Sequence, residues 1–202
     1  MLIADAKAIM NEFHVPMHIR KHCEAVANVA QQIAKGYIQK GQEINVENLV
    51  SACLLHDLFR IVDISEESYK KLCENADEYD KNTWDITRMR YKGKTHSQIA
   101  YEFLKDKGED ELANLIKKHY FVAIIDLNDK AFTLEEKILT YADKRVLHEN
   151  IVSLKERFED GAKRYNKENE DPNQKEAIYN AYFDLEKELF DPIDLKPEDI
   201  KE

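Results

Sequence analysis

The side chains of His56 and Asp57 stand in the least polar part of the sequence. They fall within Asn48–Arg60, a stretch that is apolar on nearly every side and that predicts a buried helix. A carboxylate in such surroundings is costly unless it is hydrogen-bonded, paired with a charge or bound to a metal ion. The sequence therefore predicts a dedicated partner for Asp57, to be sought among the polar groups of other helices.

Further polar groups stand three or four positions from apolar residues, so each shares the apolar face of its own predicted helix. They are His22, His96, His119 and Asp143. Imidazole and carboxylate groups on facing helices are the ligands that helical bundles use to bind metal ions. The pattern alone leaves two interpretations open, a metal centre or polar core residues that backbone carbonyls satisfy one by one.

Helices are needed to position these groups, and the composition favours them. Of the 202 residues, 43% are hydrophobic, 5 are glycine and 4 are proline, which fits one all-α domain with some additional elements. Apolar spacing and capping residues predict helices over Leu2–Phe13, Met17–Gln39, Asn48–Arg60 with Asn45 as its N-cap, Thr95–Lys107, Glu109–His119, and from a capping box at Thr133–Glu136 onward.

Two segments between these helices have a different character. Asp63–Trp84 is polar and acidic, and it predicts one or two short helices that form an excursion over the core. It leads into Arg88–Lys94, where four of seven residues are cations, the densest positive run of the chain. Phe121–Ile125 is the one run that suits a strand, but it has no evident partner, so we expect a loop or a helix extension there.

The predicted domain organisation has two parts. Residues 1–147 form one domain with its core at about 17–145, and residues 148–202 form a helical extension that packs on the same domain. We expect this extension to break near Asn169–Pro172 and its tail after Asp191 to be poorly ordered.

The charge and the missing motifs exclude several classes of partner. The net charge of -10 disfavours nucleic acid, and no apolar run approaches the roughly 18 residues that span a membrane. The 3 cysteines form no CxxC pair, which favours reduced thiols and a cytoplasmic protein, and the N-terminus is not a signal peptide. No glycine-rich nucleotide loop is present. The expected partner is a small molecule, and a homodimer stays open.

The order of the candidate ligands is itself informative. His22, the pair His56-Asp57 and then Asp143 follow one another as H…HD…D. A valine-rich helix follows the first histidine, an apolar run precedes the pair, and an alanine precedes the last aspartate. Over roughly Met17–Arg145 the chain resembles the HD superfamily of metal-dependent phosphohydrolases, which implies an HD-domain helical bundle and a hydrolase.

His96 and His119 extend this resemblance. They are similar to the two additional histidines of the binuclear branches of that superfamily, which include the cyclic-di-nucleotide phosphodiesterases (HD-GYP) and small bacterial enzymes that split diadenosine tetraphosphate symmetrically. The residues after the pair, Leu58-Phe59-Arg60, depart from the HD-GYP pattern, and no GYP motif exists. The chain therefore looks closer to the diadenosine-polyphosphate type, with the excursion and the C-terminal extension as additions.

The resemblance implies two metal sites that share one ligand. The first takes His22, His56, Asp57 and Asp143, and the second takes Asp57, His96 and His119. A carboxylate has two oxygens and can bridge two ions, which the neutral imidazole cannot. Two ions about 3.5–4 Å apart clamp the attacking and leaving oxygens of an in-line displacement, and a metal-bound hydroxide is the nucleophile. Mixed nitrogen and oxygen ligation suits Fe, Mn, Co, Ni or Zn better than Mg alone.

Cations near the predicted ligands are candidates for contacts to phosphate oxygens. Arg60 and Lys94 join Asp57 as the predicted catalytic residues, because they stand three residues after Asp57 and two before His96. Further candidate substrate contacts are His18, Arg88, Arg90, Lys144 and Arg145. The alternative for each cation is an ordinary surface ion pair or a solvated charge.

The leading hypothesis is a metal-dependent phosphohydrolase that cleaves a phosphoester or phosphoanhydride of a nucleotide-like substrate. One alternative is a mononuclear enzyme similar to the 5′-nucleotidases, in which His96 and His119 bind no metal. Another is a non-catalytic module that binds a nucleotide without changing it. The number of bound ions separates the first two hypotheses, and hydrolysis separates both from the third.

Overall fold

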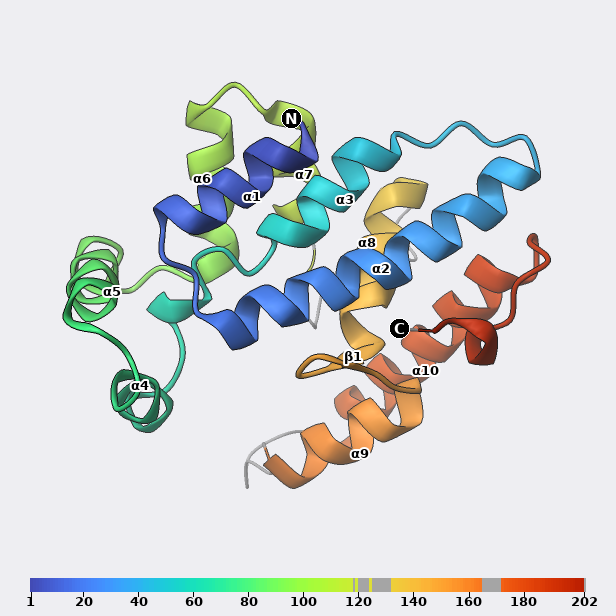
Figure 1. Ribbon diagram of the computed structural model, residues 1–202. Coiled ribbons are helices and arrows are strands. Elements are labelled where there is room, and N and C mark those ends of the chain that lie inside the picture. Colours follow the sequence, from blue (N-terminus) through green and yellow to red (C-terminus); the bar gives the residue numbers. More distant parts are fainter. Residues whose placement is uncertain (118, 120–123, 125–131, 165–171, 202) are drawn as a thin grey trace.

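The computed structural model describes residues 1–117, 119, 124, 132–164 and 172–201 (Figure 1). Helices make up nearly all of its regular structure, and within these residues the only sheet is a hairpin of two short strands. The prediction of an all-α fold is confirmed. Among the same residues, no helix is both long enough and apolar enough to cross a lipid bilayer.

The helices alternate with short connections along the chain. In order they are α1 Ile3–Glu12, α2 Met17–Gln39, α3 Val46–Leu55, α4 Glu66–Cys73, α5 Glu78–Arg90, α6 His96–Asp106, α7 Asp110–Lys117, α8 Leu134–Lys144, α9 Leu154–Arg164 and α10 Pro172–Phe190. Short 3-10 turns stand at η1, Arg60–Val62, and η3, Pro197–Asp199. Strands β1, Val146–Leu147, and β2, Asn150–Ile151, pair antiparallel.

Helix α2 is the axis of the bundle (Figure 1). It packs against α3 and α8, while α3 also packs against α1 and α7, and α6 against α7. Val26, Val29 and Ile33 on α2 are completely buried, as their spacing predicted. The apolar faces of these helices therefore enclose the space into which the predicted ligands point.

The buried helix α3 is shorter than predicted. Asn45 caps it by accepting a hydrogen bond from the Asn48 N–H, as expected, but the helix ends at Leu55 and not at Arg60. The backbone then tightens, because the Arg60 N–H bonds to the carbonyl of Asp57 only three residues back. His56 and Asp57 thus occupy the helix end and the following turn. Apolar burial of 49–59 predicted a helix there, but burial does not distinguish a buried turn from a buried helix.

Two capping boxes position the helices that carry the later ligands. The Thr95 hydroxyl accepts from the Gln98 N–H while Gln98 returns a bond to the Thr95 N–H, and Thr133 and Glu136 do the same for α8. The capping box predicted at Thr133–Glu136 is confirmed, and Thr95 caps the helix that was predicted to begin there. The first box sets His96 at the first residue of α6, and the second starts the helix that ends beside Asp143.

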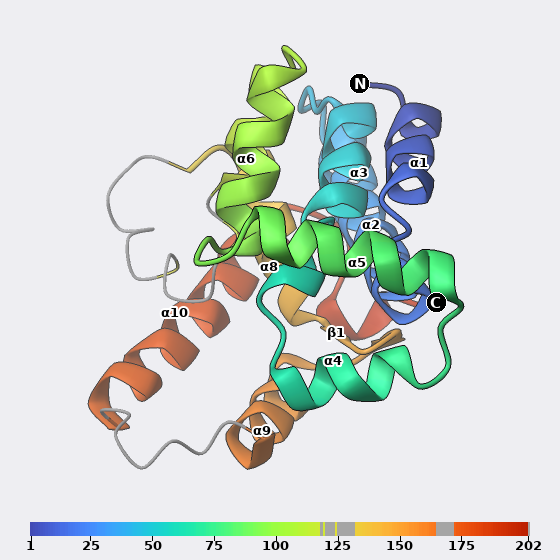
Figure 2. The ribbon, with the colours of Figure 1, turned by 90° about the vertical axis from the view of Figure 1, so that its left-hand side faces the viewer.

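The excursion, for which one or two short helices were predicted, contains two, and the second continues beyond Trp84 to Arg90. Helix α4 has no buried residue, and α5 buries Trp84 and Thr87. The Trp84 indole N–H donates to the carbonyl of His14 at 2.7 Å, which ties α5 to the turn between α1 and α2. Figure 2 shows α5 crossing the ends of the bundle helices, with α4 farther from them.

The C-terminal extension differs from the prediction in two respects. The β1–β2 hairpin, which was not predicted, stands between α8 and α9. The tail after Asp191, which we expected to be poorly ordered, packs on α2: Ile193 and Ile200 are buried, and Gln32 donates to the Lys201 carbonyl at 2.7 Å. A Cβ on Gly36 would lie 2.9 Å from Ile193 Cδ1, so this glycine permits the close approach.

Two expectations fall on residues outside the described part of the chain. They are the loop or helix extension at 121–125, of which only the buried Ile124 is described, and the break near 169–172, of which only Pro172, the first residue of α10, is described.

Candidate metal centre

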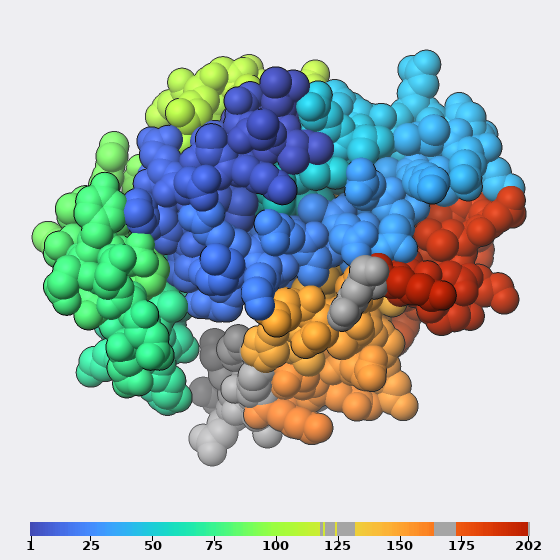
Figure 3. Space-filling model, viewed as in Figure 1, coloured from blue at the N-terminus to red at the C-terminus, as the bar shows by residue number. Residues whose placement is uncertain are grey.

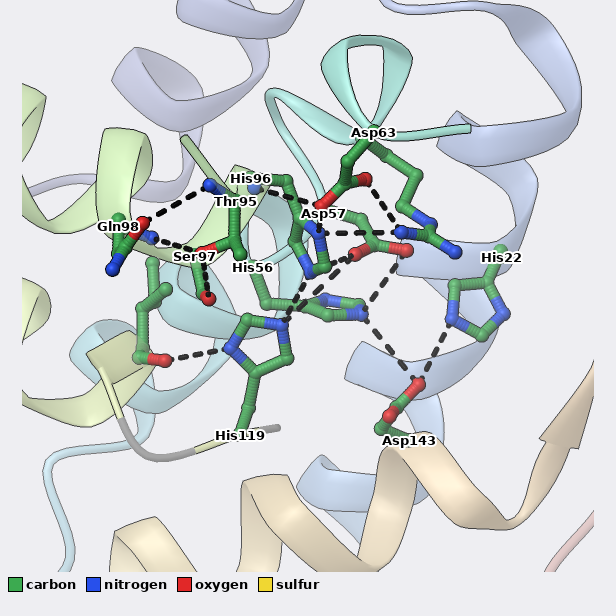
Figure 4. Close-up of polar contacts among 12 residues, drawn as sticks. His22, His56, Asp57, Asp63, Thr95, His96, Ser97, Gln98, His119 and Asp143 are labelled. Carbon is green, nitrogen blue, oxygen red and sulfur yellow. Dashed lines mark hydrogen bonds and ion pairs between the residues drawn. The ribbon is translucent and has the colours of Figure 1, made fainter. Parts of the chain in front are cut away.

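The structure brings the six predicted ligands together at the centre of the bundle (Figure 4). One group combines His22 of α2, His56 at the end of α3 and Asp143 of α8. The Asp143 Oδ1 atom lies 3.1 Å from His22 Nε2 and 3.7 Å from His56 Nε2. Within this group, the candidate ligand atoms all lie within 4.8 Å of one another, which is the spacing of atoms around one ion.

Asp57, His96 and His119 form a second group of the same kind. Asp57 Oδ1 lies 3.2 Å from His96 Nε2 and 4.0 Å from His119 Nε2. The other oxygen of Asp57, Oδ2, lies 3.9 Å from His56 Nε2 in the first group. The carboxylate of Asp57 therefore presents one oxygen toward each group, which is the arrangement that a bridging ligand requires.

The orientation of the four histidines is the same in every case. Each uses Nδ1 for a bond outside the cluster and directs Nε2 inward (Figure 4). The Nδ1 partners are the carbonyl of His148 for His22 at 3.0 Å, the carbonyl of Cys53 for His56 at 2.7 Å, the Asp63 carboxylate for His96 at 2.6 Å, and the carbonyl of Ile116 for His119 at 2.6 Å. An acceptor at Nδ1 fixes the proton there and leaves the Nε2 lone pair for a metal ion.

Some inward atoms have too few partners from the protein itself. His56 Nε2 is buried and, within the described part of the chain, has no hydrogen-bond partner. His96 Nε2 and His119 Nε2 face each other at 3.1 Å, although both are acceptors when their Nδ1 atoms carry the protons. Divalent ions would satisfy these lone pairs, and the mixed nitrogen and oxygen donor set suits transition metals. The residues therefore fit the metal ions that their chemistry implies.

The electrostatics favour the ligating forms of Asp57 and His119, whereas at His56 the neighbouring Cys23 and Asp57 outweigh burial and hold the pKa of the imidazole well above its usual value. Burial by itself would raise the pKa of Asp57, but the imidazoles of His56 and His96 outweigh it and hold the pKa of this carboxyl well below its usual range. Burial lowers the pKa of His119 to about 3, so this imidazole is neutral at physiological pH. Neutral imidazole and ionised carboxylate are the forms that bind metals.

A cavity of about 200 Å³ opens beside the cluster. The residues that line it are His18, Ile19, His22, Asp57, Arg60, Ile64, Val146, His148, Glu149 and Arg157. Arg60 donates to Asp63 at 2.6 Å, and its guanidinium lies 3.3 Å from His96 Nδ1. Of the predicted substrate contacts, Arg60 and His18 thus lie at the cavity, and the ammonium of Lys144 pairs with Asp143 of the cluster.

The structure does not bring the remaining predicted cations to the cluster. Lys94 pairs with Glu102 at 2.5 Å on the surface, and Arg90 is exposed beside the ring of Tyr91. Arg88 donates to the carbonyl of Ile61 and pairs with Glu66. Arg145 points toward the C-terminal extension, where it donates to the carbonyls of Val152 at 2.6 Å and Pro197 at 2.9 Å.

Asp63 and Arg157 are among the groups at the site that were not predicted from the sequence. Asp63 receives bonds from both the backbone N–H and Nδ1 of His96, at 3.0 and 2.6 Å, and so holds this ligand in place. Arg157 reaches the cavity from α9. Asp63 stands in a polar acidic stretch and Arg157 in an amphipathic helix. Polar residues among polar neighbours are not conspicuous in the sequence, so neither residue could be singled out.

Comparison with known proteins agrees with this geometry. Residues 19–146 match the model of the HD domain family, well over half of the chain. An uncharacterized protein of Methanocaldococcus jannaschii, MJ0778, is 27% identical over 148 residues, which make up 68% of this chain and 71% of the relative. No solved structure matches the chain.

The matched range contains all six side chains of the cluster, from His22 to Asp143. HD domains bind divalent metals, and their superfamily is one of metal-dependent phosphohydrolases. By its sequence match, with the histidine and aspartate groups gathered as described, the chain belongs to the HD domain family.

Proposed function

We propose that this protein is a binuclear metal-dependent phosphohydrolase that cleaves a phosphoester or phosphoanhydride of a nucleotide-like substrate. The observation that carries the proposal is the common orientation of the four histidines. Each has its Nδ1 proton engaged by an outside acceptor and its Nε2 atom directed to one of two aspartates. Histidines that served only as core residues would have no reason to converge in this form.

The side chains of the cluster would hold two ions. A pair of divalent ions supplies Lewis-acid activation of water and of phosphate oxygens. Asp57, ionised and facing both groups, would fix the separation of the two sites. Burial by itself would raise the pKa of Asp143, but the adjacent Lys144 ammonium outweighs it and holds the pKa of this carboxyl well below its usual range.

Water is the nucleophile that the cavity favours. The described residues that line it include no serine, threonine or cysteine, so no hydroxyl or thiol is placed for covalent catalysis. The guanidinium of Arg60 stands at the same cavity, on the side of the second metal group, since it lies next to His96. A phosphate oxygen that reached Asp57 would therefore have a fixed positive charge close by.

The adjoining space supports a substrate of nucleotide size. A second cavity of about 680 Å³ lies between the start of α2 and the excursion, and its lining includes Leu72, Ala76 and Trp84. His18 and Glu149 line both cavities, so the two are neighbours. A ligand with its phosphate beside the cluster has room for an organic group of drug-like or nucleoside size in the second cavity.

Metal analysis tests the proposal directly. Protein dialysed against Mn²⁺ should retain two ions per chain by inductively coupled plasma mass spectrometry, and His119→Gln should retain one. His14→Gln serves as the control, because His14 pairs with Asp80 outside the cluster. One ion in the wild type, unchanged by His119→Gln, would favour the mononuclear alternative.

Activity is tested on a panel of dinucleoside polyphosphates, nucleoside monophosphates and cyclic nucleotides with Mn²⁺, Fe²⁺, Co²⁺ and Ni²⁺. We expect release of phosphate or of a nucleotide from at least one class. Binding of two ions without any hydrolysis across this panel would contradict the enzyme proposal and favour a nucleotide-binding module.

A further inference from the structure

The C-terminal extension contributes one cation to the cavity beside the metal cluster. Arg157 of α9 lines the same cavity as Asp57 and Arg60, although it follows them by about 100 residues in the chain. Its Nε atom is buried and finds no hydrogen-bond partner in the described residues. A buried guanidinium nitrogen without an acceptor is costly, so this side chain has hydrogen-bonding capacity that the described residues leave unused.

Folded elements fix the position of Arg157. Its neighbours Leu154 and Phe158 are buried, and the ring of Phe158 stacks on Tyr179 of α10 with centroids 4.2 Å apart. At the start of α9, Ser153 accepts from the Glu156 N–H, and the hairpin before it is tied to Arg145. These contacts set the rotation of α9, so the side chain of Arg157 is directed to the cavity by a helix and not by a loop.

The charges around the cavity favour an anion at this position. Arg157 and Arg60 both line it. Arg60 is already bonded to Asp63. Of the acidic residues that line the cavity, Asp57 faces the metal groups and Glu149 pairs with Lys21 at 3.1 Å. Guanidinium groups bind the tetrahedral oxygens of phosphate with pairs of parallel hydrogen bonds.

We propose that Arg157 binds the phosphate of the substrate, so that the C-terminal extension completes a cleft for a small organic phosphate held between Arg157 and Arg60 beside the metal cluster. The identity of the anion as phosphate rests on the proposed function. Arg157 lies beyond residues 19–146, the part that matches the family, so this contact belongs to the extension of this chain. The space-filling view shows the surface hollowed beside α4, below the N-terminal end of α2 (Figure 3).

Titration calorimetry of inorganic phosphate into the Mn²⁺-loaded full-length protein tests the proposal. Arg157→Gln should weaken the phosphate Kd about tenfold, the size expected from loss of one charge-assisted hydrogen bond. The matched control is Lys155→Gln, which removes the same charge from the same helix at a side chain that is 78% exposed. This control should bind phosphate within about twofold of the wild type, because exposed charges contribute little.

A second variant separates binding from folding. Arg157→Lys keeps the charge and most of the apolar stem but loses the planar fork, so its Kd should lie between those of the wild type and Arg157→Gln. Thermal melts by circular dichroism identify any variant that fails to fold. If Arg157→Gln does not fold, the lysine variant decides, and phosphate binding by it that equals the wild type overturns the proposal.

The outcomes distinguish this proposal from the proposed function. If Arg157→Gln loses phosphate affinity and the wild type hydrolyses no substrate, the phosphate-binding site is supported and the proposed enzymatic function is contradicted. Hydrolysis with a KM and a phosphate Kd that Arg157→Gln leaves unchanged would keep the enzyme and overturn the phosphate site. A wild type that binds no inorganic phosphate overturns it as well.

Discussion

In the metal cluster the polar side chains are held by distant parts of the chain, whereas many charges of the excursion are held by near neighbours. His22 is anchored by the carbonyl of His148, 126 residues away, and its Nε2 meets Asp143 from a third element. In the excursion, Lys71 pairs with Glu67 and Lys81 with Glu78, one helical turn away on the surface. The first arrangement exists only in the complete fold, and the second requires little more than a helix.

The difference in burial sets the energetic weight of each region. The side chain of His56 is 1% exposed and that of His119 is 4% exposed, whereas Lys71 is 70% exposed. Removing one member of a buried polar cluster leaves its partners unsatisfied, but a surface charge that loses its partner returns to water. Substitutions should therefore have large effects in the cluster and small ones at the exposed charges of the excursion.

The largest effect is expected for Asp57→Asn. The amide has one acceptor oxygen in place of two and no charge, so it cannot bridge both groups, and kcat should fall by about a thousandfold or more with loss of at least one ion. Activity and metal content measure this. Asp85→Asn makes the same change at an exposed carboxylate on α5 and should retain both. A fully active Asp57→Asn protein would contradict the prediction that substitutions in the cluster have larger effects than those in the excursion.

Trp84 attaches the excursion to the rest of the fold, through its burial and its hydrogen bond to His14. Trp84→Ala should lower the free energy of unfolding by about 3–5 kcal/mol, since it empties a site where the residue is 3% exposed and removes the bond to His14. Urea unfolding measures the loss. Trp84→Phe keeps most of the packing and should lose about 1 kcal/mol. Metal content should stay at the wild-type value in both, because no ligand lies on α4 or α5.

A substitution of Asp63 tests how far metal affinity depends on the hydrogen bond that orients the candidate ligand His96. Asp63→Asn weakens the bond that orients His96, so the affinity for the second ion should fall about 10- to 100-fold while the first ion stays. Competition with a metal chelator measures each affinity. Equal loss of both ions would show that the two groups do not bind independently.

The smallest effect is expected for the basic run. Lys94→Gln and Arg90→Gln should change kcat/KM by less than about twofold, because Lys94 pairs with Glu102 and Arg90 is exposed at the end of α5. Steady-state kinetics with the substrate found in the panel measure this. A tenfold loss in either variant would show that the basic run reaches the substrate, as the sequence alone suggested.

The same contrast explains which features could be predicted from the sequence. His22 and Asp143 are polar residues on apolar faces, and Thr95 and Thr133 stand three residues before a glutamine and a glutamate, so local spacing identifies them. The roles of Asp63 and Arg157 depend on which elements meet in space, and no local pattern records this. The cations at Arg88–Lys94 are conspicuous in the sequence, but in the structure Arg88 pairs with Glu66 and Lys94 with Glu102, away from the cluster.

The remaining differences have the same origin. Helix α3 ends at Leu55 and the chain turns there, which brings Asp57 to face both ligand groups, although the surrounding residues stay buried. The tail around Ile193 and Ile200 has little periodicity of its own and becomes ordered through its contacts with α2. Tertiary packing decides both, and local propensity does not record it.

The carbonyl that anchors His22 belongs to the backbone of residue 148, and this affects how the protein can vary. His148 adopts a left-handed conformation with φ 58°, and its side chain is exposed. Glycine, asparagine or aspartate could occupy that position and leave the carbonyl in place. A substitution of His148 by one of these residues should therefore retain the interaction that orients the candidate ligand His22.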